Sequence, residues 1–430
     1  MTAAEPATDI HDPFGALREP DFRRFLAGNF LALLGSQMQA TAVGWELYEQ
    51  TGQALDLGLV GLVQVLPVIL LAIPAGQVID RCDRRLVILV SLTVLCGCSL
   101  ALAWMSHVGT TRGGILACLL VNGLARTFLQ PAKSSLVPTL VPRLRFPNAV
   151  TWSTSSFQLA TVVGPGIGGS IIGWTHWAAP VYLLDAVFTG FFFWQTARLP
   201  RRPAAAAGQP VTWRSLLGGV EFVWRTRLVL GALTLDMFAV LLGGATALLP
   251  VFAKDILCVG PEGLGYLRAA PGIGALVVSC AMAFLPPLRR AGWTLLLSVA
   301  GFGLATVIFG LTRSYPVALA MLFLTGALDM VSVIIRHTLV QTWTPDEMRG
   351  RVSAVNSLFI GISNELGALE SGAVAQLFHR PLDPAWGPMV AVVSGGLGTL
   401  LVVLATAVLV PAIRRYDRLG EGPDAPSDRD

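Results

Sequence analysis

The segment Gly76-Gln77-Val78-Ile79-Asp80-Arg81-Cys82-Asp83-Arg84-Arg85 lies at the junction of two long apolar runs, 55–79 and 86–106. Five of its ten residues are charged. An apolar run of about 20 residues is long enough to cross the hydrocarbon core of a bilayer as a helix. A charged loop between two such runs cannot enter lipid without a large free-energy cost. The segment therefore predicts two membrane helices joined by a very short polar loop.

The composition indicates an integral membrane protein throughout. Hydrophobic residues make up 54% of the chain and charged residues 13%, against about 25% charged residues in soluble domains. The first residues are polar and lack a basic region followed by an apolar stretch, so we expect no signal peptide. The six cysteines show no zinc-binding spacing, and we expect no metal and no cofactor.

Twelve apolar runs are candidate spans, and their continuous hydrophobicity predicts α-helices rather than barrel strands. They cover 22–46, 55–79, 86–106, 114–136, 150–173, 179–198, 228–252, 264–285, 293–311, 316–340, 352–378 and 388–412. The predicted fold class is an all-α membrane protein.

The distribution of basic residues predicts the orientation of these spans. With the N-terminus in the cytoplasm, 21 arginines fall on the cytoplasmic side and only four basic residues on the opposite side. The positive-inside rule then places both termini in the cytoplasm and the protein in the inner membrane. The net charge of +4 follows this topology, so we expect no nucleic-acid partner.

The chain divides into two related halves. We expect an N-terminal tail at 1–21, a six-helix bundle at 22–198, a linker with an amphipathic helix at 199–227, a second bundle at 228–412 and a C-terminal tail at 413–430. A gapless shift of 203 residues pairs seven identical residues: Gly123/Gly326, Leu136/Leu339, Val137/Val340, Thr139/Thr342, Pro142/Pro345, Gly164/Gly367 and Gly169/Gly372. A constant offset of half the chain favours duplication and two pseudo-symmetric bundles.

Three motifs resemble those of the major facilitator superfamily of secondary transporters. They are the Gly-x-x-x-Asp-Arg-x-x-Arg-Arg loop, Gly164-Pro165-Gly166-Ile167-Gly168-Gly169 in the fifth span, and Asn122-Gly123-x-x-Arg126-x-x-x-Gln130-Pro131 in the fourth. Further stretches, such as Phe22-Arg23-Arg24-Phe25-Leu26 and Thr344-Pro345-Asp346-Glu347-Met348-Arg349-Gly350-Arg351-Val352, resemble its branch of drug and siderophore exporters. The resemblance implies two six-helix bundles that work by alternating access.

The resemblance also implies roles for the first two motifs. In the loop, Gly76, Asp80, Arg81, Arg84 and Arg85 would form a conformational latch against the start of the eleventh span, near 350–352. The alternative is a positively charged loop without moving parts. The resemblance associates the glycine–proline motif of the fifth span with exporters and antiporters, in which it would kink the helix. The alternative is ordinary packing of small residues between helices. The motif residues are Gly164, Pro165, Gly166, Gly168 and Gly169.

Several charged residues lie inside predicted spans, where charge is expensive and usually functional. We expect proton-coupling residues among Asp236, Asp329, Glu365, Arg126 and Arg336. The 203-residue shift places Asp329 on Arg126 and Arg336 on Lys133, so these charges could face one cavity or form a structural ion pair between the halves. Polar candidates for lining a substrate cavity are Gln37, Gln64 and Asn364.

These observations favour proton-coupled export of an amphiphilic small molecule, either a drug-like compound or a siderophore. The expected partners are that substrate, protons and the lipid bilayer, and the expected state is a monomer. Two alternatives remain: a proton symporter that imports a polar nutrient, and a membrane sensor that binds ligand without transport. No nucleophile–base or metal arrangement indicates an enzyme.

Overall fold

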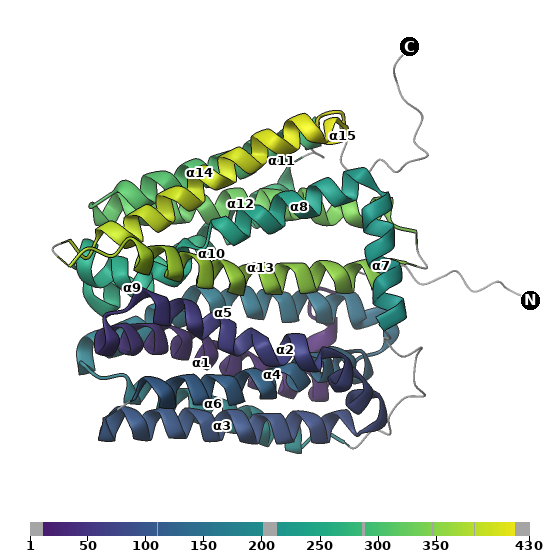
Figure 1. Ribbon diagram of the computed structural model, residues 1–430. Helices are drawn as coiled ribbons and strands as arrows, with labels where there is room; N and C mark the ends of the chain where they lie inside the picture. Colours follow the sequence, from purple (N-terminus) through teal and green to yellow (C-terminus); the bar gives the residue numbers. More distant parts are fainter. Residues whose placement is uncertain are drawn as a thin grey trace, which may run out of the picture.

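The computed structural model describes residues 12–109, 111–200, 213–285, 289–345, 348–381 and 383–417. Within them the chain forms twelve helical spans arranged side by side (Figure 1). The spans are α1 (Pro20–Thr51), α2 (Ala54–Arg81), α3 (Arg84–Val108), α4 (Arg112–Leu140), α5 (Phe146–Thr175), α6 (Ala179–Ala197), the α8 segment (from Arg227–Leu242 onward), α10 (Gly260–Phe284), α11 (Ala291–Leu311), α12 (Tyr315–Trp343), α13 (Arg349–Leu377) and α14 (Trp386–Leu409). The predicted all-α membrane fold is confirmed.

Successive spans run in opposite directions, so the start of α1 and the short helix α15 (Pro411–Arg414) lie at the same end of the molecule (Figure 1). We call this the terminal end and the other the distal end. The predicted amphipathic linker helix is present as α7 (Trp213–Arg225), also at the terminal end. The preceding tether, 201–212, lies outside the described residues.

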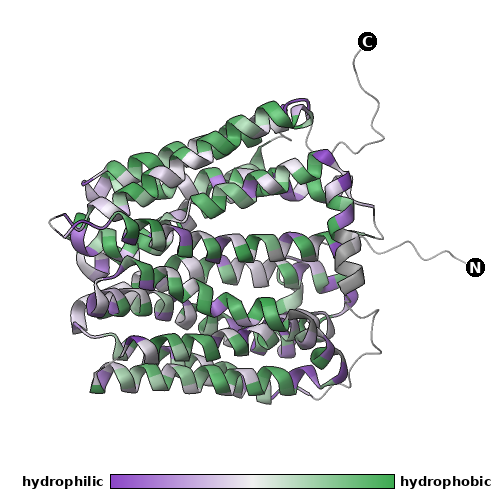
Figure 2. Ribbon diagram, in the orientation of Figure 1, coloured by the Kyte–Doolittle hydropathy of each residue, from purple (hydrophilic) through white to green (hydrophobic). Residues whose placement is uncertain are grey.

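Hydrophobic residues predominate along the spans (Figure 2). Eight of the helical segments in the described part of the chain are long and apolar enough to cross a membrane by length and composition alone. The other four, α1, α5, α6 and α13, carry more polar and small residues.

The two halves repeat the same helix contacts. Each glycine related by the 203-residue shift lies so close to a neighbouring helix that a Cβ on it would clash. Gly164 contacts α1 and its counterpart Gly367 contacts α8; Gly169 contacts α10 and Gly372 contacts α2; Gly123 contacts α2 and Gly326 contacts α10. In every pair the contacted helices are themselves equivalent between the halves. The repeat seen in the sequence is therefore a repeat in space, and small residues set the helix spacing.

The seventh span departs from the prediction of one continuous helix over 228–252. Helix α8 ends at Leu242, and the chain continues through the 3-10 turn η3 (Ala245–Leu248), α9 (Leu249–Val251) and the π-helical turn η4 (Phe252–Ile256). The break falls at Gly243 and Gly244, and a Cβ at Gly244 would approach the Gly367 carbonyl oxygen of α13 within about 2.5 Å. Hydropathy cannot reveal this break because both sides of it are apolar.

The bundles meet through α5 with α10 and through α2 with α13, and the glycines of these contacts lie toward the distal end. Gly169 packs against Gly265, and a Cβ built on Gly58 would lie only 2.9 Å from Leu369 Cα of α13. Tyr48 near the end of α1 donates a hydrogen bond to the Asp255 carboxylate of the other half. The described structure is therefore closed between its bundles at the distal end.

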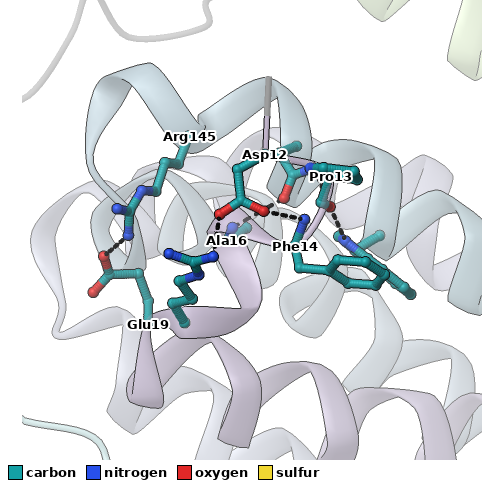
Figure 3. A network of polar contacts seen from close by, with 9 residues as sticks. Asp12, Pro13, Phe14, Ala16, Glu19 and Arg145 are labelled. Atoms are coloured by element: carbon teal, nitrogen blue, oxygen red, sulfur yellow. Dashed lines mark hydrogen bonds and ion pairs between the residues drawn. The ribbon is translucent and has the colours of Figure 1, made fainter. Parts of the chain in front are cut away.

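At the terminal end, the residues before α1 are fastened to the start of α5 (Figure 3). The Asp12 carboxylate accepts a hydrogen bond from the Phe14 amide at 3.0 Å, and the Pro13 carbonyl accepts one from Trp152 Nε1 at 3.0 Å. Arg145 forms an ion pair with Glu19 at 2.7 Å. These contacts hold α1 and α5 together at their terminal ends.

Candidate functional site

The C-terminal bundle contains a buried ionic cluster on α8 and α12. Asp236 of α8 forms an ion pair with Arg336 of α12, and their side chains are 8% and 3% exposed. Asp329 lies seven residues before Arg336, two turns earlier on the same helix face. Asp236 and Asp329 line one small cavity together with Ser332 and Phe302. Its water-accessible volume of about 10 Å³ leaves room for roughly one water molecule.

Asp329 differs from Asp236 in having no ion pair or hydrogen bond to another described residue. The charges of Asp236 and Arg336 nevertheless act on it across the cavity. A carboxylate without a fixed partner can gain or lose a proton without first breaking an ion pair. Of the predicted proton-coupling residues in this cluster, Asp329 therefore differs from Asp236 in being free of an ion pair among the described residues.

The N-terminal bundle contains a second polar cluster, around Asp185 of α6. Ser99 donates a hydrogen bond to the Asp185 carboxylate at 2.6 Å, and Gln39 donates one to Ser99 at 3.0 Å. Arg126 of α4 donates to Ser36 of α1 at 2.7 Å. Asp185, Gln39, Arg126 and Ser36 line a cavity of about 60 Å³, enough for a few water molecules and too small for a drug-sized ligand.

Arg126 lies under the influence of acids from both halves. The Asp185 carboxylate in its own bundle and the Glu365 carboxylate of α13 both act on its charge. Glu365 itself reaches α2, because a Cβ at Gly61 would clash with its carboxylate. Arg126 and Asp329, which the repeat pairs, line separate cavities, one in each bundle.

The repeat is clearer two turns farther along α4 and α12, toward the terminal end. Lys133 of α4 donates a hydrogen bond to Asn29 of α1 at 3.0 Å, whereas Arg336 of α12 forms its ion pair with Asp236 of α8. Helices α1 and α8 are equivalent, so a cation meets an acceptor on the same helix pair in each half. The acceptor is neutral in one half and acidic in the other.

The remaining polar candidates occupy varied positions. The Cβ of Gln37 packs against Gly164, and the backbone of Gln64 packs against Gly123, so both take part in helix contacts. Asn364 is exposed and donates to the Ile360 carbonyl of its own helix at 2.8 Å. Of the glutamines on α1, it is Gln39 that lines the N-terminal cavity.

The glycine–proline motif of α5 lies between two helices of different bundles. Gly164 and Gly168 face α1, while Gly169 faces α10. A Cβ built on Gly265 of α10 would in turn clash with the Pro165 carbonyl and meet Gly166. The motif therefore forms part of the distal closure, and an antiporter role for it stays a prediction.

The charged loop is held within its own bundle. Asp83 accepts a hydrogen bond from the Arg85 amide at 2.9 Å and caps α3, and Arg84 donates to the Ser135 carbonyl at 3.0 Å. Arg85 donates to the Thr196 carbonyl at 3.2 Å. A Cβ at Gly76 would meet no neighbouring atom within 4 Å.

Gly350 lies at the start of α13, on the predicted far side of the latch. A Cβ built on it would also meet no neighbouring atom within 4 Å. Arg81 is exposed, and the Asp80 side chain lies outside the described part of the structure. The two glycines are therefore not at a helix contact in this conformation, and the latch stays a prediction.

Sequence reasoning missed Asp185, Arg268 and the contact between Tyr48 and Asp255. Asp185 and Arg268 each interrupt an apolar run, which is the signal that identified Asp236. The contact of Tyr48 with Asp255 joins residues near the ends of two spans, and such pairing has no local signal.

Two repeated six-helix bundles with buried charges and a closure at one end define a secondary transporter. The chain belongs to the Transmembrane secretion effector family of the major facilitator superfamily, whose pattern matches residues 11–411. It is 24% identical over 400 residues to the Enterobactin exporter EntS of Shigella boydii serotype 18, covering 92% of this chain and 93% of the relative. The enterobactin exporter of Escherichia coli O139:H28 shows the same identity and coverage.

Solved structures show the same fold. The nucleoside transporter NupG superposes with a TM-score of 0.70 at 14% identity, covering 92% of this chain and 100% of that one. A bacterial homologue of the lysosomal transporter Spinster, solved in an inward-facing and unoccupied conformation, gives 0.70 at 15% identity, with 93% and 99% covered. These findings agree with the prediction of a transporter fold and with the expectation that the protein is not an enzyme.

Proposed function

We propose that this protein exports an amphiphilic small molecule, a siderophore or a drug-like compound, across the inner membrane in exchange for protons. The observation that carries the coupling is Asp329, an intramembrane carboxylate in a cavity of water size and without a fixed partner among the described residues. The substrate class is supported by the relatives named as enterobactin exporters. The arginine distribution supports a cytoplasmic terminal end.

In this orientation the distal closure would lie on the outer side, which supports a conformation that loads substrate from the cytoplasm. Protonation of Asp329 would remove a negative charge beside the Asp236–Arg336 pair. Because Asp236 competes with Asp329 for the same arginine, the proton on Asp329 would strengthen the remaining pair. A proton can drive transport only by binding one conformation better than the other.

The test uses purified protein in proteoliposomes that contain a pH-sensitive dye, with enterobactin as the first probe. We expect substrate-dependent proton flux for the wild type and its loss in Asp329→Asn. Asp236→Asn should retain part of the flux, because Asp329 remains. Glu49→Gln, which changes an exposed acid at the end of α1, is the matched control and should behave as wild type.

Absence of substrate-dependent proton flux from the wild type across a panel of siderophores, dyes and antibiotics would refute proton antiport. Inward accumulation of substrate along the proton gradient would instead identify a symporter. Binding without any flux would identify a sensor. Each of these outcomes replaces the proposal.

A further inference from the structure

Three arginines of the described chain lie seven or more residues from both ends of their helical spans, at positions 126, 268 and 336. Arg336 has its ion pair with Asp236, and Arg126 has Ser36 as a hydrogen-bond partner and acids nearby in both bundles. Arg268 has no ion pair or hydrogen bond to any residue in the described ranges, and its Nε is buried without a partner. An unpaired cation within a membrane is costly, so it is retained for a function.

The position of Arg268 is between the bundles. It lies eight residues after the start of α10, about 12 Å into the span at 1.5 Å per residue. Its Nη2 lies 2.8 Å from the place where a Cβ on Gly44 of α1 would stand, and Pro250 of α9 is 3.3 Å from the same point. Gly44 thus provides the space that the guanidinium occupies, between elements of both halves.

The side chain is also not sealed. Arg268 is partly exposed, although Leu267 and Ala269 on either side of it are buried. The distal closure formed by Tyr48 with Asp255 lies beyond it toward the end of α1, four residues after Gly44. Arg268 therefore lies on the inner side of that closure, between elements of both bundles.

We propose that Arg268, framed by Gly44 and Pro250, is a binding site for two adjacent oxygen acceptors of the transported molecule, such as a carboxylate or a catechol. A guanidinium presents parallel N–H donors that match an oxygen pair, and a charge-assisted bond of this kind is strong away from bulk water. The inference rests on the proposed export function for its biological meaning. Its test by binding does not depend on transport.

The decisive measurement is binding to the full-length protein in nanodiscs by pairs of probes that differ only at the oxygens. Pyrenebutyrate against its methyl ester tests the carboxylate, and 4-nitrocatechol against its dimethyl ether tests the catechol. We expect wild type to prefer at least one oxygen-bearing member by about tenfold or more, as charge-assisted hydrogen bonds permit. The pair that shows the preference identifies the chemical source.

The variants separate this role from a structural one. Arg268→Gln should remove the preference while affinity for the ester or ether stays within about twofold, and Arg268→Lys should restore only part of it because an ammonium lacks the planar fork. Gly44→Ala should weaken the preference with the arginine still present, because the added methyl displaces the guanidinium. Arg313→Gln, an exposed arginine between α11 and α12, is the control and should keep the preference.

If Arg268→Gln fails to fold, Gly44→Ala decides the question. Equal binding of both members of each pair by wild type, or an unchanged preference in Gly44→Ala and Arg268→Gln, overturns the proposal. Neither result would touch proton-coupled export, which the flux assay tests separately. Conversely, a clear preference without any proton flux would keep the Arg268 site and remove the antiport mechanism.

Discussion

The ion pair between Asp236 and Arg336 allows a quantitative prediction, because two acids share one cation. In Arg336→Gln, the buried Asp236 and Asp329 lose the positive charge that acts on both. Removing one partner of a buried pair typically costs about 3–5 kcal/mol. We therefore expect the free energy of unfolding to fall by about that amount.

Replacing the acid of the pair should lower the free energy of unfolding by less than replacing the arginine. In Asp236→Asn, the asparagine still accepts a hydrogen bond and Asp329 remains to balance Arg336, so we expect a loss of about 1–3 kcal/mol. The double variant Asp236→Asn/Arg336→Gln contains a neutral, hydrogen-bonding pair and should lose clearly less than the sum of the two single variants. Coupling energies for contacting residues are about 0.5–3 kcal/mol.

The assay is denaturant unfolding in mixed micelles, followed by circular dichroism, with Arg313→Gln as the control for loss of an exposed arginine. Equal destabilisation by Arg336→Gln and Asp236→Asn would show that Asp329 does not share the cation. Additive losses in the double variant would show that the pair contributes no coupling. Either result would refute the description of this cluster.

Three further predictions concern the contacts between the bundles and the charged loop. Gly169→Leu should open the distal closure, because a side chain there clashes with α10, and a fluorescence probe pair across α5 and α10 should report a larger separation; an unchanged separation would contradict the packing. Tyr48→Phe removes the hydrogen bond to Asp255 and should increase solvent accessibility at the distal end. Thiol labelling of a cysteine introduced nearby measures this, and an unchanged labelling rate would show that the bond does not contribute to the closure. Gly76→Cys should react rapidly with a maleimide in the conformation described here, since it faces open space, and slow labelling would place a neighbouring helix against it.

The sequence predicted the elements of this fold well because most spans are long apolar runs, and α1, α5, α6 and α13 are still apolar enough to be recognised between polar loops. The linker helix was predicted from its apolar stripe, and the described structure contains it over Trp213–Arg225. The break at Gly243 could not be predicted, since apolar residues on both sides hide it and its cause is the approach of α13. Asp236 and Arg336 were each predicted as candidate residues, but the sequence did not indicate that they form an ion pair with each other.

That failure has a physical reason. The 203-residue shift compares equivalent places in two bundles, whereas ion pairs form between neighbouring helices within one bundle. The shift paired Arg126 with Asp329, which lie in separate cavities. Asp185 was missed although it interrupts an apolar run as Asp236 does. Depth in a span identifies a candidate residue, but only helix packing determines its partners.

The same packing suggests why the halves have diverged in charge. Among the described residues that line the N-terminal cavity, Arg126 and Lys133 accompany one acid, Asp185, whereas the two acids that line the C-terminal cavity, Asp236 and Asp329, share the cation Arg336. With all of these groups ionised and Glu365 of α13 left aside, the first cluster carries excess positive charge and the second excess negative charge. Under the proposed coupling, a proton on Asp329 neutralises the excess in the second cluster and weakens its attraction to the first. An exact repeat would place like charges in both halves and could not couple protonation to bundle separation in this way, so the divergence of the repeat is what the mechanism requires.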